Sequence, residues 1–160
     1  MESTSLAEVV MPPEAVLKHW QAHRRLTRRV IDAFPDDALF EHTIGGMRPF
    51  SELAAEMIGM AVPSLRGVVT RKWLASGKVD APTKGDLLRL WDESTEEINE
   101  LWPTIPPGRM QEVDVAFGQW EMPMYDLLFY VIDNEIHHRG QGYVYLRALG
   151  IEPPPFYERS

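Results

Sequence analysis

Asp133-Asn134-Glu135-Ile136-His137-His138-Arg139-Gly140-Gln141 places polar, metal-capable side chains in the middle of an otherwise apolar helix face. The segment around it, from about Pro123 to Leu149, shows the three- and four-residue spacing of a helix. At about 100° per residue, one face combines apolar residues with amide and imidazole groups. This face carries Leu127, Val131, Asn134, His138, Gln141 and Tyr145. Burying Asn134 and His138 costs free energy unless each finds a partner, so we expect another side chain, a water or a metal ion to bind them.

Two segments near the start of the chain have the same helical periodicity. Pro12-Pro13 opens the first, because proline is tolerated in the first turn, and Pro35 ends it. Pro49 opens the second, which we expect to kink or break at Pro63 and to continue towards Trp73. We expect a loop between these two helices.

A third helix is predicted after Thr83, because Thr83 and Asp86 resemble a capping box. Between Arg109 and Trp120 the alternation of apolar and polar residues predicts a short extended segment or hairpin. With the helix from Pro123, the chain then has four helices joined by short to medium loops. This pattern predicts an all-α four-helix bundle, as one domain over residues 1–160.

The tail from Ile151 to Ser160 contains three consecutive prolines and cannot continue the last helix. We expect it to be extended and to pack Phe156 and Tyr157 back onto the body.

Composition restricts the classes of function. The chain of 160 residues has a net charge of −8, which disfavours a nucleic-acid partner because such binding needs a basic face. A local basic cluster, Arg24, Arg25, Arg28 and Arg29, is interpreted as the solvated outer face of the first helix. There is no cysteine, so any metal must be held by nitrogen and oxygen ligands. No signal-peptide pattern and no uninterrupted apolar run of about 20 residues is present, so we expect a cytoplasmic protein without a membrane partner.

Two pairs of residues have the four-residue spacing by which one helix can offer two ligands to an ion. His19 and His23 form the first pair, but only His23 lies in the middle of the apolar stripe, so a core or pocket-wall role is favoured for it. Asn134 and His138 form the second pair. Spacing alone leaves a metal site and a hydrogen-bonded core cluster both open there.

The end of the chain resembles the closing signature of the DinB superfamily. The resemblance lies in Glu135-Ile136-His137-His138-Arg139-Gly140-Gln141, the following Tyr145-Leu146-Arg147-Ala148-Leu149-Gly150-Ile151, and Pro153-Pro154. The segment from Pro49 to Gly59 resembles the second-helix segment of the same DinB/YfiT-like proteins. The resemblance implies a four-helix bundle, a homodimer, and a fold shared with transferases that use bacillithiol or mycothiol.

In that family a divalent ion is typically held by three histidines, one on the second helix and two on the fourth. The resemblance carries these positions to Glu56, Asn134 and His138, so that one carboxylate, one amide and one imidazole replace the three imidazoles. Such a set would bind zinc or nickel more loosely than three histidines and would shift preference towards harder ions such as manganese. Zinc, nickel, manganese and iron all remain open at this stage. His23, Gln141 and Tyr145 are candidates to line the same pocket.

Two functions follow from the resemblance. The first is a metal-dependent hydrolase or thiol transferase acting on a small molecule, in which a bound ion activates a water or a thiol. The second is a non-catalytic bundle that has lost the metal and binds a small ligand or a protein partner. In the second case Glu56 would bond to Asn134 or to His138 without an ion.

Overall fold

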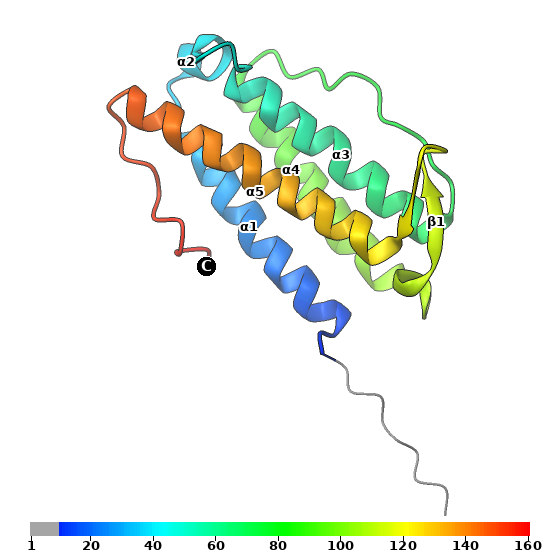
Figure 1. Cartoon of the computed structure of the whole chain (residues 1–160). Helices are drawn as coiled ribbons and strands as arrows, with labels where there is room; N and C mark the ends of the chain where they lie inside the picture. The colour runs from blue at the N-terminus through cyan, green and yellow to red at the C-terminus, as the bar shows by residue number, and fades with distance from the viewer. Residues whose placement is uncertain (1–9) are drawn as a thin grey trace, which may run out of the picture.

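The computed structural model describes residues 10–160, and it confirms the four-helix bundle (Figure 1). The long helices are α1 (Pro13–Ala33), α3 (Phe50–Thr70), α4 (Lys84–Leu101) and α5 (Met124–Ala148). Helix α3 packs against α4 and α5, and α1 packs against the same two helices from the other side. Helix α5 therefore has two covered faces, one against α1 and one against α3, and an outer face towards solvent.

The segment between α1 and α3 contains a short helix, α2 (Asp36–Glu41), where the sequence predicted only a loop. Pro35 precedes this helix, and Asp36 and Asp37 occupy its first turn, where negative charge is favourable. Leu39 is fully buried, so one apolar anchor stabilises the turn. The prediction failed because this single anchor is too little for a visible periodicity.

After α4 the chain forms two short 3₁₀ turns, η1 (Trp102–Thr104) and η2 (Arg109–Gln111), and then an antiparallel hairpin. The predicted extended segment is confirmed as strands β1 (Val113–Ala116) and β2 (Trp120–Pro123), in the register Val113↔Pro123 to Ala116↔Trp120. Strand β2 leads directly into α5, so the hairpin caps one end of the bundle (Figure 1).

Helix α3 continues through Pro63 as one helix, so of the predicted break or kink the break does not occur. Proline at this position removes the N–H that would bond to the carbonyl of Gly59. The Oγ of Ser76 donates to the oxygen of Gly59 at 3.0 Å and so supplies the missing donor. A residue of the loop that follows α3 thereby allows the helix to run on.

The start of α4 confirms the capping interaction predicted at Thr83. The Oγ1 of Thr83 accepts a hydrogen bond from the backbone N–H of Asp86 at 3.1 Å. The Asp86 carboxylate accepts from the Thr83 hydroxyl at 2.6 Å, whereas in a capping box it would accept from the Thr83 backbone N–H.

Two groups of buried side chains form the core, one towards each end of the bundle. Trp20, Leu128 and Ile132 belong to the group nearer the hairpin. The other surrounds the stacked rings of Phe34 and Phe50, whose centroids lie 4.8 Å apart.

The C-terminal tail folds back beside α1 and α5, as the sequence predicted, but not through its aromatic side chains (Figure 1). Phe156 and Tyr157 are 66% and 69% exposed. Instead, Arg25 and Arg29 donate to backbone oxygens of residues 159 and 158, and the Tyr143 hydroxyl donates to the oxygen of Pro154 at 2.7 Å. The tail is therefore attached through its backbone carbonyls, of which that of Pro154 belongs to the proline run.

By length and composition, α3 is the one helix in the described part of the chain that is apolar enough to cross a membrane. Here it lies inside the bundle, and 56% of its most apolar window is buried against the other helices.

Candidate functional site

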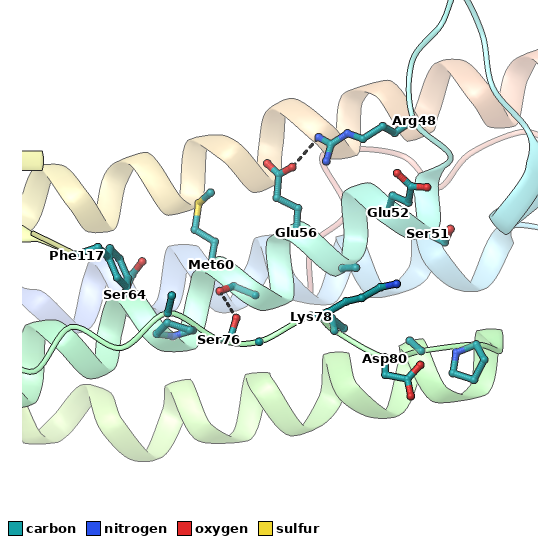
Figure 2. Close-up of a pocket in the computed structure, with 18 of the residues that line it drawn as sticks. Arg48, Ser51, Glu52, Glu56, Met60, Ser64, Ser76, Lys78, Asp80 and Phe117 are labelled. Atoms are coloured by element: carbon teal, nitrogen blue, oxygen red, sulfur yellow. Dashed lines mark hydrogen bonds and ion pairs between the residues drawn. The ribbon is translucent and has the colours of Figure 1, made fainter. Parts of the chain in front are cut away.

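A groove of about 1010 Å³ runs along the outer side of α3 (Figure 2). Glu52, Glu56 and Met60 follow one another at four-residue spacing, so they present their side chains along the same side of the helix. The loop after α3 forms another wall of the groove, and Phe117 and Trp120 of the hairpin close one end. The groove is therefore aromatic at one end and charged at the other.

Glu56 is the anchor of the charged end. Its Oε2 lies 2.6 Å from a guanidinium nitrogen of Arg48, the residue two positions before α3 begins, and both side chains are partly exposed (Figure 2). Partial burial alone would raise the pKa of Glu56, but hydrogen bonds from Arg48, Asn134 and His138 outweigh it and hold the pKa below its usual value. Glu56 is therefore a carboxylate at neutral pH.

Asn134 and His138 reach the same carboxylate from α5. The Oε1 of Glu56 accepts from the Nδ2 of Asn134 at 3.2 Å and lies 3.0 Å from the Nε2 of His138. The Nδ1 of His138 lies 2.7 Å from the Oε1 of Gln141. Both imidazole nitrogens thus face side-chain oxygens. The structure brings together the three residues that the family resemblance selected.

This arrangement does not fit a resident divalent ion. The carboxylate of Glu56 is already neutralised by Arg48, and its other oxygen accepts two side-chain hydrogen bonds. One neutral amide and one imidazole are a weak remaining donor set for zinc or nickel. Within residues 10–160, no group of three histidine, aspartate or glutamate side chains is close enough to hold a metal.

One observation favours a bound ion or water at this site. The Oδ1 of Asn134 is buried and has no hydrogen-bond partner among the described residues. A buried acceptor without a partner is costly, and an ion or an ordered water would relieve that cost.

The three predicted pocket residues have different environments. Gln141 contacts His138 directly, as described above. Tyr145 is buried, and its hydroxyl donates to the backbone oxygen of Arg48 at 2.8 Å, so it fixes the loop that carries Arg48. His23 is not part of this cluster. It lies against the other covered face of α5, where Arg139 donates to its Nδ1 at 3.0 Å.

A second polar cluster in the bundle, centred on Glu135, was not predicted from the sequence, which places this residue off the helix face of Asn134 and His138. Glu135 is only 2% exposed. It accepts hydrogen bonds from Thr27 at 2.7 Å and Trp20 at 3.2 Å, and it lies 3.8 Å from the guanidinium of Arg24. The signal was present in the sequence: Glu135 follows Ile132 by three residues and precedes Arg139 by four, which places it on the α1-facing side of α5.

Arg24 corrects the interpretation of the basic cluster as a solvated face. Its guanidinium is buried, stacks 3.8 Å from the ring of Trp91, and donates to Thr95, Ser94 and the Trp91 carbonyl. Burial lowers the pKa of Arg24 to about 10, and the attraction of Glu135 opposes that shift. Burial likewise raises the pKa of Glu135, against the attraction of Arg24. The pair joins α1, α4 and α5 in the centre of the bundle.

The neighbouring His19/His23 pair is not arranged as a metal chelate. The two Nε2 atoms lie 3.2 Å apart, and Arg139 donates to the Nδ1 of His23. A neutral His23 then carries its proton on Nε2 and directs it at His19, so it has no lone pair free for an ion.

We expect acid to destabilise the protein through His23. Burial, with the positive charge of Arg139 next in importance, lowers the pKa of His23 from about 6.5 to about 3. The unfolded chain therefore binds a proton at this residue between about pH 6.5 and pH 3, while the folded chain does not, so stability falls as the pH drops through that window. Urea unfolding at pH 7.5 and pH 5 should show this loss in the wild type and a smaller one in His23→Gln. An equal pH dependence in both proteins would exclude His23 as the cause.

Comparison with known proteins supports the fold. A model of the DinB family matches residues 3–160. A DinB-like protein from Bacillus cereus ATCC 10987 is 20% identical, with a TM-score of 0.73 over 90% of this chain and 97% of its own. A DinB-like protein from Bacillus subtilis is 17% identical, with a TM-score of 0.70 over 91% of this chain and 99% of its own. No characterised protein in the curated collections matches the sequence.

Proposed function

The chain belongs to the DinB family, and on that premise we propose that it binds a small organic molecule in the groove along α3 without a resident metal ion. The observation that carries the proposal is the ion pair between Arg48 and Glu56 at the charged end of the groove. The guanidinium supplies, at the family's metal-site position, the positive charge that an ion would otherwise supply.

The lining of the groove indicates what kind of molecule fits. Phe117 and Trp120 offer aromatic surface at one end. Ser64, whose buried hydroxyl has no partner among the described residues, lies beside Phe117 at this end (Figure 2). At the other end Arg48 and Lys78 carry positive charge, next to carboxylates of the groove lining that include Glu56. An elongated molecule with an aromatic or apolar end and a polar, charged end matches this order of groups.

The aromatic anion 8-anilinonaphthalene-1-sulfonate is a suitable first probe. We expect the probe to bind saturably to the folded protein, as measured by the fluorescence of the probe. Ala55→Trp fills the middle of the groove and should abolish that binding. The control is Glu96→Trp, which adds the same side chain at an exposed position of α4 outside the groove. Equal binding by both variants would place the probe elsewhere and count against the groove.

A second candidate is the metal-dependent hydrolase or thiol transferase that the family resemblance implies. The buried, unpartnered Oδ1 of Asn134 favours it, because an ion is one partner that would satisfy this atom. Metal content separates the two candidates, since the second requires an ion and the first does not.

A further inference from the structure

The four arginines clustered on α1 have two different kinds of partner. Arg24 and Arg28 each face a carboxylate. Arg25 and Arg29 donate instead to backbone oxygens of the C-terminal tail, which runs beside α1 and α5 (Figure 1). Neither of these two forms an ion pair within residues 10–160. Two cations of α1 are therefore left with neutral carbonyl groups as acceptors.

Two more arginines approach the same strip, one from α5 and one from the tail. Arg139 is 5% exposed and donates to the backbone oxygen and the Nδ1 of His23. The Nη1 of Arg159 lies 3.5 Å from the Nε2 of the same histidine. Neither forms an ion pair in the described part of the chain, where the nearby Glu135 pairs with Arg24. We call the strip between α1, α5 and the tail the arginine seam, and its four cations are Arg25, Arg29, Arg139 and Arg159.

His23 cannot accept from both of the arginines that face it. A neutral imidazole has one ring nitrogen that accepts and one that donates, and a guanidinium only donates. With Nδ1 accepting from Arg139 at 3.0 Å, Nε2 carries the proton and faces Arg159 as one donor faces another. The Nε2 of His19, 3.2 Å away, has one lone pair at most, and it is used when His23 donates to it. The guanidinium of Arg159 makes no other hydrogen bond among the described residues, so an acceptor is missing at this point.

A second donor without an acceptor lies in the arginine seam. The Nε of Arg29 is buried and has no hydrogen-bond partner among residues 10–160. A buried donor without a partner costs free energy, and an anion that accepts from it would remove that cost. His19 and Arg25 at the edge of the seam are exposed, so a solute can enter from that side. The seam therefore combines an excess of positive charge with donors that lack acceptors, in a chain whose net charge is −8.

We propose that the arginine seam binds a phosphate group, which supplies the acceptor that Arg159 and His23 lack. Guanidinium groups bind phosphate through paired N–H donors, and an ionised acceptor makes a stronger hydrogen bond than the neutral carbonyls that Arg25 and Arg29 now contact. Phosphate oxygens point in four directions, which suits donors that arrive from a helix and from the tail. The site lies on the α1 side of α5, so it is separate from the groove along α3 and does not rest on the function proposed for that groove.

Nuclear magnetic resonance of the imidazole groups tests the site in the intact chain, which has five histidines. Inorganic phosphate is titrated at pH 7.5, with sodium chloride at equal ionic strength as the reference. We expect the ¹⁵N signals of His19 and His23 to shift and to saturate, while that of His42, which contacts Tyr145 instead, stays in place. Shifts that do not saturate, or that sodium chloride reproduces, would overturn the proposal.

Arg159→Gln is the matched variant, because it removes the guanidinium that lacks an acceptor and lies outside every helix. It should weaken phosphate binding at least tenfold. Arg66→Gln removes a partly exposed arginine of α3 that pairs with Glu97, outside the seam, and should leave the affinity unchanged. Equal affinity of the two variants would contradict the proposal. Phenyl phosphate identifies the source of the group: binding tighter than that of inorganic phosphate supports a phosphomonoester, and weaker binding supports the free ion.

Discussion

Glu135→Ala should lower the free energy of unfolding by about 3–5 kcal/mol, the usual cost of removing one partner from a buried ion pair. The substitution would leave Arg24 buried without its counter-charge and would remove the acceptor of Thr27 and Trp20. It would also leave a cavity among α1, α4 and α5. Equilibrium unfolding in urea, followed by circular dichroism, measures the effect.

Two further variants make this test specific. Glu96→Ala removes an exposed glutamate of α4 that has no ion-pair partner among the described residues, and it should change stability by less than about 0.5 kcal/mol. Glu135→Gln keeps one acceptor and most of the volume, so its loss should be intermediate. A loss below about 1 kcal/mol for Glu135→Ala would show that the buried cluster does not hold the helices together.

Zinc affinity should rise by more than about 100-fold when histidine is restored at positions 56 and 134. Substituting residues that only support the direct ligands of a metal site already alters metal affinity by about 10- to 100-fold. Here two direct ligands change, so the effect should be larger. Glu56→His also removes the partner of Arg48, and Asn134→His removes the weak amide donor. Together with His138, the two new residues recreate the three-imidazole set expected of the family. Calorimetric titration of zinc into the wild type and the double variant measures the change.

Adding His138→Ala to that double variant provides its control. The third change should abolish the gain in affinity, because His138 is the imidazole already oriented by Gln141. If the double variant binds zinc no better than the wild type, the positions taken from the family are not the metal positions of this chain.

The sequence was sufficient for the parts of the fold that depend on local patterns. The spacing around Val131 and Ile132, the proline-initiated helices and the Thr83 cap all predict elements that the structure contains. Pro63 was judged by the same local rules, and the break that they allow there does not occur. The donor that replaces its missing N–H is Ser76, whose position depends on how the following loop lies against α3.

The sequence predicted some residues of the candidate site and missed others. Glu56, Asn134 and His138 lie together in the structure, and the sequence could group them because two lie on one helix face and the family resemblance supplied the third. Arg48 was missed because it lies in a loop, where no periodicity indicates its direction. Yet Arg48 is the residue that argues against a metal ion held by Glu56, Asn134 and His138, because its guanidinium neutralises the carboxylate that a metal would need.

Glu135 illustrates a different limit. Its position on a buried face follows from the spacing of Ile132, Glu135 and Arg139, but the sequence was interpreted as having one buried face on this helix. Helix α5 contacts both α1 and α3, so it has two. The charge of Glu135 favoured an exposed position, and only the fold shows the arginines that balance it.

We propose that the Arg48–Glu56 ion pair gives the groove a charged end that needs no resident ion. Elemental mass spectrometry tests it most directly, on wild type and His138→Ala purified without an affinity tag or added metal. We expect far less than one ion per chain in both proteins. Close to one divalent ion per chain in the wild type, absent from His138→Ala, would contradict the claim and identify the protein as a metal-binding member of the family.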